Sequence, residues 1–220
     1  MSPMSANIIT VVRVILTFLT IFLYGRGHPL PFLAFLLTIL VIYMDALDGM
    51  IARRLGVASD FGALLDITGD RIVENVYWIY FTVAGMVSIW VPVFVIARGF
   101  LTDTLRSVAF AEGKTPFGEK SMMRSAFTRF LVSSRFSRGL YGVLKAVVFC
   151  DLGFILAMKS GIAEGAFAPH EKFMAGNTLF AGILVWVVFA MCIVRGLPVL
   201  WDGKDYVLAK RFPRAIKNES

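Results

Sequence analysis

Four aspartates stand at short intervals in an apolar part of the chain: Asp45, Asp48, Asp66 and Asp70. The first two are three residues apart and the last two are four apart, so each pair shares one face of a helix. A charge at the centre of a bilayer costs about 2.5–3.5 kcal/mol even on the lenient insertion scale, so such carboxylates need a positive partner. Because hard carboxylate oxygens suit Mg²⁺ or Mn²⁺, we predict a site that holds divalent metal.

Small residues and one arginine accompany the aspartates. Gly49 and Ala52 flank the first pair, and Gly62 lies one helical turn before the second pair. Missing side chains let a ligand approach the backbone closely. Arg53 offers a guanidinium fork that fits a phosphate. The seven residues 54–60 join the two aspartate pairs as antiparallel neighbours. The pattern therefore indicates a metal-held pyrophosphate site.

The elements that must position these residues are long apolar runs. The chain has 220 residues, of which 58% are hydrophobic, whereas soluble domains are about 45–50% apolar. Each run approaches the ~20 residues that a helix needs to cross a bilayer. Lipid offers the backbone no hydrogen-bond partners, so the backbone groups must bond to one another within a helix. We expect an all-α bundle of six transmembrane helices forming a single membrane domain over 1–220. The six runs are Ile8–Tyr24, Phe32–Ala52, Ala63–Val87, Ile89–Phe110, Tyr141–Met158 and Thr178–Val199.

Basic residues predict the orientation of this bundle. Of the 22 lysines and arginines, 14 fall in the connections after the second and fourth runs and in the C-terminal tail, when Arg195 near the end of the sixth run is counted with the tail. Three fall on the other side. This bias places both termini and the aspartates at the cytoplasmic face. The net charge of +7 then reflects topology and anionic lipid, and not nucleic acid. Residues 113–139 fit either an amphipathic segment on the membrane surface or a solvated loop.

The motif resembles the signature of the CDP-alcohol phosphatidyltransferases. That signature, D-x2-D-G-x2-A-R-x8-G-x3-D-x3-D, is matched without a gap by Asp45, Asp48, Gly49, Ala52, Arg53, Gly62, Asp66 and Asp70. The stretch Asn7-Ile-Ile-Thr10-Val-Val-Arg13 is similar to the N-x-x-T-x-x-R entry to the family's first span. Taken alone, Asn7, Thr10 and Arg13 fit equally well a helix cap, a buried threonine and an arginine that extends toward the membrane surface.

The resemblance implies a reaction and a role for each motif residue. A phosphatidyl group would pass from CDP-diacylglycerol to an alcohol, within a homodimeric membrane enzyme that uses two Mg²⁺ or Mn²⁺ ions. Asp45, Asp48 and Asp66 would hold the first ion, and Asp70 would complete the second and act as general base. The CDP group would be bound by Asn7, Thr10, Asp48, Gly49, Ala52, Arg53, Gly62 and Asp66.

The acceptor alcohol is indicated by shorter similarities. Ile96-Ala-Arg98 with Leu105-Arg106, and Gly142-Val-Leu-Lys145, resemble segments of bacterial phosphatidylglycerolphosphate synthases, although Gly99 replaces a family glutamate. We expect glycerol 3-phosphate as acceptor, with its phosphate bound by Arg98, Arg106, Arg138 and Lys145. These cations could instead pair with Asp103 and Glu74. The stretch Gly69–Ile72 resembles the phosphatidylinositol-phosphate synthases, which leaves a different phosphorylated acceptor open.

Two functions of other classes compete with this enzyme. Intramembrane aspartates also occur along cation pathways, so a transporter is an alternative. A transporter would not need glycine, alanine and arginine at fixed offsets from the acids. A family member that has lost activity and serves as a scaffold is the second alternative. Release of CMP from CDP-diacylglycerol distinguishes the enzyme from both.

Overall fold

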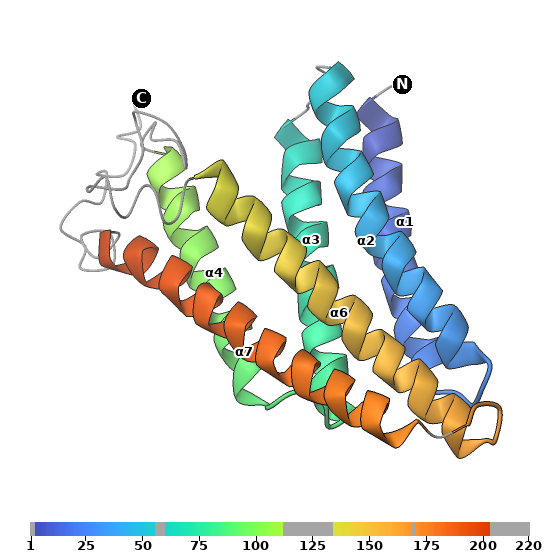
Figure 1. The fold of residues 1–220 in the computed structure, drawn as a ribbon. Helices are drawn as coiled ribbons and strands as arrows, with labels where there is room; N and C mark the ends of the chain where they lie inside the picture. The colour runs from blue at the N-terminus through green and yellow to red at the C-terminus, as the bar shows by residue number, and fades with distance from the viewer. Residues whose placement is uncertain (1–2, 56–59, 112–133, 169, 203–220) are drawn as a thin grey trace, which may run out of the picture. The chain divides into compact units, whose positions relative to one another are not determined.

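The computed structural model describes residues 3–55, 60–111, 134–168 and 170–202, and these residues form six helices and no strand. This confirms the all-α expectation. Each helix contains or overlaps one of the six apolar runs. The helices are α1 (Pro3–Tyr24), α2 (Leu30–Leu55), α3 (Asp60–Val83), α4 (Trp90–Ala111), α6 (Arg135–Ala163) and α7 (Glu171–Asp202) (Figure 1).

Some boundaries differ from those expected. The third run was expected to stay helical to Val87, but α3 ends at Val83 and a turn follows, in which Gly85 has φ of 73°. A positive φ costs glycine little, so this residue can close the helix. Helix α7 begins seven residues before the predicted run, with Glu171 in its first turn, where a carboxylate favours the helix dipole.

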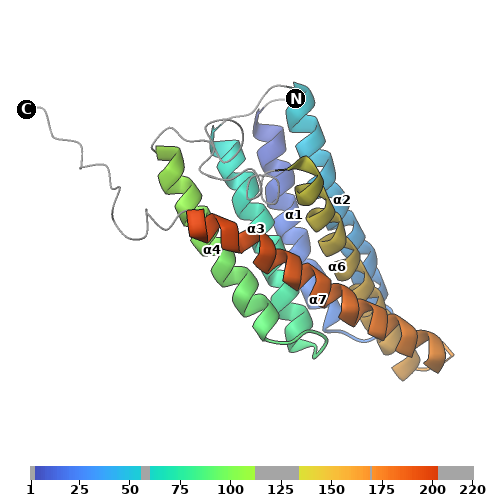
Figure 2. The same ribbon diagram turned by 60° about the vertical axis from the view of Figure 1, so that its left-hand side comes forward.

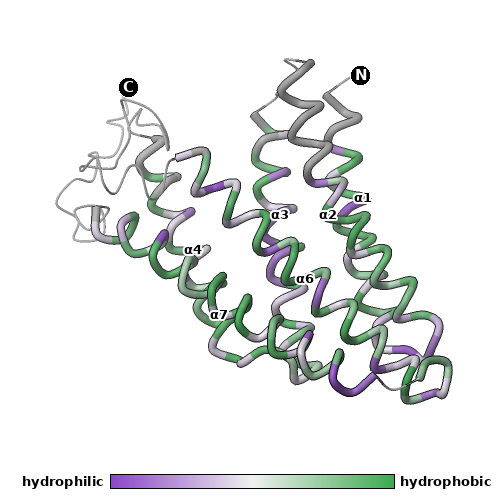
Figure 3. Tube along the Cα trace, in the orientation of Figure 1, coloured by the Kyte–Doolittle hydropathy of each residue, from purple (hydrophilic) through white to green (hydrophobic). Residues whose placement is uncertain are grey.

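Within the described parts of the chain, three helices are long and apolar enough to cross a membrane: Asn7–Tyr24, Phe136–Ala163 and Glu171–Trp201. A shorter apolar stretch covers Leu30–Asp45 in α2. Figure 3 shows the described parts of α1 and α7 as hydrophobic along most of their length. Large apolar side chains such as Ile15, Phe18 and Phe22 are more than half exposed, as expected where lipid and not water is the solvent. The chain is thus a membrane protein, and six crossings with cytoplasmic termini stay a prediction.

The chain forms two compact units, Met1–Pro92 with Lys145–Trp186, and Val93–Leu144 with Val187–Ser220. In the first unit, α1 packs against both α2 and α3, and the three helices run side by side in both ribbon views (Figures 1 and 2). Its core is aromatic: Tyr77 lies against Phe81, and Trp78 meets Phe149 edge-on at 4.9 Å between ring centroids. The single domain expected over 1–220 stays a prediction.

Buried hydroxyl groups tie the three helices of the first unit together. The Tyr24 hydroxyl lies 2.9 Å from the Thr38 hydroxyl, which also accepts a hydrogen bond from Tyr77 at 3.5 Å. Thr38 in turn donates to the Ala34 carbonyl, so its own hydroxyl is fully used. A hydroxyl without a partner is costly in an apolar surrounding, so these bonds favour one arrangement of α1, α2 and α3.

The second unit contains most of α4 together with the first turns of α6 and the last turns of α7. Val95, Tyr141, Val188 and Cys192 are buried there. Phe94 and Phe189 meet edge-on at 5.8 Å. The residues 112–133 lie outside the described part of the chain, so the two interpretations of 113–139 are not distinguished.

Candidate metal centre

Three of the four predicted aspartates converge within the first unit. Asp45 comes from α2, and Asp66 and Asp70 come from α3. Each offers a carboxylate oxygen, and these oxygens all lie within 4.8 Å of one another. The spacing of four residues in α3 places Asp66 and Asp70 on the same side of that helix, as the sequence predicted. Asp48 also lies on α2, but its side chain is outside the described residues.

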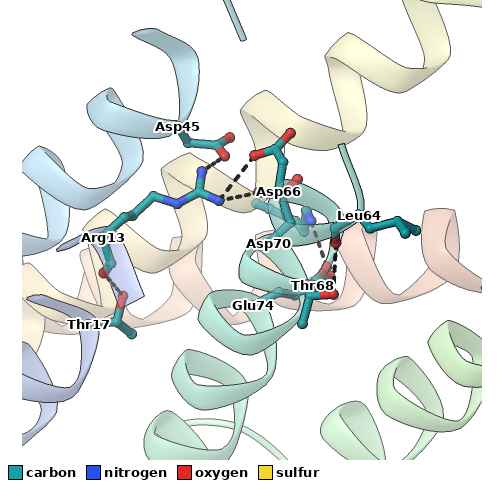
Figure 4. Close-up of polar contacts among 9 residues, drawn as sticks. Arg13, Thr17, Asp45, Leu64, Asp66, Thr68, Asp70 and Glu74 are labelled. Carbon is teal, nitrogen blue, oxygen red and sulfur yellow. Dashed lines mark hydrogen bonds and ion pairs between the residues drawn. The ribbon is translucent and has the colours of Figure 1, made fainter. Parts of the chain in front are cut away.

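Arg13 of α1 reaches into this cluster, as Figure 4 shows. Its Nη1 donates to Asp45 Oδ1, and its Nη2 donates to Asp70 Oδ1 at 2.6 Å. The same Nη2 lies 3.6 Å from Asp66 Oδ1. The arginine side chain is 1% exposed, whereas the three carboxylate side chains are about half exposed. The guanidinium therefore lies on the buried side of the acids.

This role of Arg13 was missed in the sequence, where it was assigned either to a family motif or to the membrane surface. The signal that could have identified it was present. An arginine in the interior of an apolar span, six residues after the start of the apolar stretch at Asn7, needs an acidic partner within the protein. The nearest acids in sequence are Asp45 and Asp48 of the motif.

The other motif residues are placed less fully. Thr10 is buried on α1, and Gly69 of α3 packs closely against it. Asn7 lies in α1, and Gly62 lies one turn before Asp66 in α3, as expected. Three more motif positions lie within α2, but nothing beyond their helical backbone is described: Gly49, Ala52 and Arg53.

The described residues fit a divalent ion. Magnesium takes octahedral oxygen ligands at about 2.0–2.1 Å, so oxygens bound to one ion are about 3–4 Å apart. The three carboxylate oxygens lie within 4.8 Å of one another, and could share one ion by moving closer together. The half-exposed carboxylates also leave room for water ligands and substrate oxygens, which Mg²⁺ usually keeps. Three carboxylates and one guanidinium carry a charge of −2, which a divalent ion balances.

A second charged group lies one turn beyond Asp70. Glu74 is buried, and its Oε2 lies 2.9 Å from Lys145 Nζ and 3.5 Å from Arg71 Nη1. Lys145 is thus held by the acid that the sequence named as its alternative partner. Glu74 thus brings two cations within one helical turn of the aspartates.

The remaining acceptor candidates lie in the second unit. Arg98 donates to Cys192 Sγ at 3.2 Å and to the Tyr141 hydroxyl at 3.3 Å. Arg195 donates to Ser137 and its guanidinium lies 5.5 Å from the centre of the Tyr141 ring. Arg195 was not among the predicted acceptor contacts, because in sequence it was counted with the basic C-terminal tail. Arg138 lies in the first turn of α6, and the side chain of Arg106 is outside the described residues.

Comparisons with known proteins identify the family of this chain. The family model for CDP-alcohol phosphatidyltransferase matches residues 4–194. Since this is most of the chain, the protein belongs to the CDP-alcohol phosphatidyltransferase family. It is a transferase of substituted phosphate groups in a family that is bound to membranes and generally depends on divalent metal.

Individual relatives are more distant. Two proteins of Mycobacterium tuberculosis, from strains CDC 1551 / Oshkosh and ATCC 25618 / H37Rv, are both named probable phosphatidylglycerophosphate synthase. Each is 27% identical over 163 residues, which cover 71% of this chain and 78% of the relative. An uncharacterized protein of Aquifex aeolicus is 44% identical over 65 residues, or 27% of this chain and 33% of the relative.

Proposed function

We propose that the enzyme transfers a phosphatidyl group from CDP-diacylglycerol to glycerol 3-phosphate, giving phosphatidylglycerol phosphate and CMP. The observation that carries this proposal is the convergence of Asp45, Asp66 and Asp70, at the spacing of a complete family motif. The names of the Mycobacterium tuberculosis relatives support glycerol 3-phosphate as the acceptor. We propose CDP-diacylglycerol as the donor because the family model concerns CDP-linked alcohols.

The aspartates would hold Mg²⁺ or Mn²⁺, as two ions. Asp45, Asp48 and Asp66 are proposed for the first ion and Asp70 for the second. When bound, such ions neutralise the charge of a pyrophosphate and stabilise the attacking and leaving oxygens. Around the CDP group we place the motif residues that remain: Asn7, Thr10, Gly49, Ala52, Arg53 and Gly62, with Asp48 and Asp66 at its phosphates.

Asp70 is the proposed general base. Its side chain is half exposed, so a water-soluble alcohol can reach the carboxylate. The hydroxyl of the acceptor gives its proton to Asp70, and its oxygen forms a bond to the phosphorus that bears the lipid. The bond from that phosphorus to the bridging oxygen breaks, and CMP leaves with the electron pair. A carboxylate is a weak base, but only a polarised hydroxyl has to lose its proton.

The acceptor phosphate needs cations, and we propose Lys145 first. Its ammonium is fixed on Glu74, one helical turn from Asp70, in the same unit as the aspartates. Arg98, Arg106 and Arg138 are the other proposed contacts. We also propose that the active site and both termini face the cytoplasm, where phosphorylated polyols are found, and that the protein works as a homodimer.

One assay tests the whole proposal. The purified protein is given CDP-diacylglycerol and Mg²⁺, then glycerol 3-phosphate, inositol 1-phosphate, inositol or serine in turn, and CMP is measured. We expect CMP only with glycerol 3-phosphate. Turnover with inositol 1-phosphate alone would replace the acceptor but keep the class of reaction. Metal-dependent cation flux into vesicles without any CMP would favour a transporter, and neither activity would favour a scaffold.

A further inference from the structure

The centre of the aspartate cluster already contains a cation that belongs to the chain. The Arg13 guanidinium contacts the Oδ1 atoms of Asp45 and Asp70 and lies 3.6 Å from that of Asp66. Three carboxylates whose oxygens lie within 4.8 Å of one another repel strongly. A guanidinium on the buried side of the cluster offsets this repulsion when no other cation is bound.

The orientation of Arg13 shows which of its interactions dominate. Both terminal nitrogens face the acids, whereas its Nε is buried and has no hydrogen-bond partner in the described structure. A buried donor without a partner is costly. The side chain therefore gives up one hydrogen bond to keep both ends of its fork at the carboxylates, as expected for a charge held by opposite charges.

The surrounding helix is shaped to admit this side chain. A methyl group added to Gly69 of α3 would lie 2.5 Å from Thr10 Cγ2 and 3.3 Å from Arg13 Nη2. Gly69 stands directly before Asp70 and three residues after Asp66. Because Gly69 has no side chain, the Arg13 guanidinium can lie against the backbone of α3 at this position and reach Asp66 and Asp70.

We propose that Arg13 is the resident counter-cation of the aspartate cluster and that it lowers the affinity of the cluster for divalent metal. A carboxylate lone pair that accepts an arginine N–H is not available to an ion at the same time. The positive charge also repels a second cation. Arg13 thus keeps the metal-free site folded and makes the bound metal exchangeable. It acts through its charge on the aspartates and is not a group that contacts substrate.

This inference rests on the metal role proposed above, and one experiment separates the two. Wild type, Arg13→Gln and Arg13→Lys are purified as full chains in detergent with Mn²⁺ and then freed of metal with EDTA. Free Mn²⁺ is followed by its electron paramagnetic resonance signal during a titration, and the melting temperature is measured with and without the ion. Arg26→Gln is the matched control, because it removes an exposed arginine two residues after the end of α1.

Loss of the charge at Arg13 is expected to have two opposite effects. In EDTA, Arg13→Gln melts below wild type, because the acids repel without a counter-cation. Its Mn²⁺ affinity rises on the order of tenfold, and Mn²⁺ raises its melting temperature more than that of wild type. Arg13→Lys keeps the charge but loses the fork, so its affinity falls between the two. Arg26→Gln matches wild type in both measurements.

Unchanged or weaker Mn²⁺ binding by Arg13→Gln would overturn the proposal, since an arginine that only orients the ligands helps binding. If Arg13→Gln is not recovered as folded protein even with Mn²⁺, then Arg13→Lys decides: affinity equal to or below wild type rejects the counter-cation. Failure of the metal role looks different. In that case wild type and every variant leave Mn²⁺ free in solution.

Discussion

Arginines occupy two contrasting environments in this molecule. In the first unit, Arg13 is buried beneath three aspartates, which outnumber its charge. In the second, Arg98 and Arg195 lie against the ring of Tyr141, and they donate to neutral groups of Cys192, Tyr141 and Ser137. Hydrogen bonds to neutral groups fix the geometry of a guanidinium. The first environment suits an added cation, and the second contains Arg98, which we propose as a contact of the acceptor phosphate.

The largest effect is expected from the acids. Asp70→Asn should reduce turnover by about 10³-fold, because the amide cannot accept the proton of the acceptor. Binding of CDP-diacylglycerol should persist in part, since the other acids remain. Turnover is measured as CMP release and binding with a labelled donor. Glu171→Gln, at the exposed start of α7, is the control and should have wild-type activity. Near-normal CMP release by Asp70→Asn would reject the base.

Removing metal should abolish activity, which depends on the aspartates, but should not prevent the arginines from binding the acceptor phosphate. We expect no activity in EDTA, and recovery on addition of Mg²⁺ or Mn²⁺, because the pyrophosphate charge is otherwise unbalanced. Binding of the acceptor phosphate by arginine should not require the ion. Isothermal titration with glycerol 3-phosphate in EDTA tests that separation. Full activity in the chelator would remove the metal from the mechanism.

The basic environment predicts a smaller and more selective loss. Arg98→Met should raise the KM for glycerol 3-phosphate by about 10–100-fold, since one charge-assisted hydrogen bond is worth about 1.5–3 kcal/mol. The KM for CDP-diacylglycerol should stay within about twofold, because Arg98 is proposed to contact the acceptor and not the donor. Steady-state kinetics with each substrate varied in turn measures both. An equal rise in the KM values of both substrates would mean that Arg98 supports the fold and does not bind the acceptor.

Lys145→Met tests whether the cation next to Asp70 acts on the acceptor. It should raise the same KM by a similar factor, because Lys145 also offers a single charged donor. Glu74 would be left buried without its closest cation, so the melting temperature should fall as well. Glu74→Gln is the companion variant, because it removes the charge that Lys145 pairs with and keeps Lys145 itself. If Glu74→Gln reproduces the whole kinetic defect, the pair is structural.

A substitution in the packing around Arg13 should change the stability of the protein without changing its charge. Gly69→Ala should lower the free energy of unfolding by about 1–3 kcal/mol, because the added methyl group overlaps Thr10 and crowds Arg13. Gly176→Ala in α7 is the matched control: nothing lies within 4 Å of the added atom, so the better helix propensity of alanine should be neutral or favourable. Reversible denaturation in detergent measures both. Equal stability of the two variants would show that α1 and α3 can separate at this point.

The smallest effect is expected away from both arginine environments. Asn177 of α7 donates to Asp151 of α6 at 2.8 Å, and such interhelical bonds in membranes contribute about 0.6 kcal/mol on average. Asn177→Ala should therefore lower stability by about that amount and leave CMP release unchanged. Thr178→Ala, which removes only a bond to its own helix, is the control. A kinetic defect in Asn177→Ala alone would extend the functional site to this pair.

The sequence was sufficient for the six helices and for the convergence of Asp45, Asp66 and Asp70. Long apolar runs allow only helices in lipid, and helical periodicity places residues three or four apart on one side. Helix ends were less predictable. The early start of α7 and the end of α3 at Val83 depend on local turns and dipole interactions, which hydrophobicity does not report.

Contacts between distant segments were the other limit. Nothing in the spacing around Arg13 shows that it crosses to acids 32 and 57 residues away. Arg195 was likewise counted as part of a basic tail, although α7 continues to Asp202 and brings it to Tyr141. In both cases the residue type was informative, but its partner is set by how helices pack in three dimensions.

The close approach at Gly69 also restricts the routes by which this sequence can diverge. A side chain at position 69 meets Thr10 and Arg13 together, so replacing any one of the three alters what the other two can become. Among descendants that keep this arrangement, positions 10, 13 and 69 should vary as a group. A lineage that acquires alanine at position 69 should be found with a smaller residue at 10 and without arginine at 13.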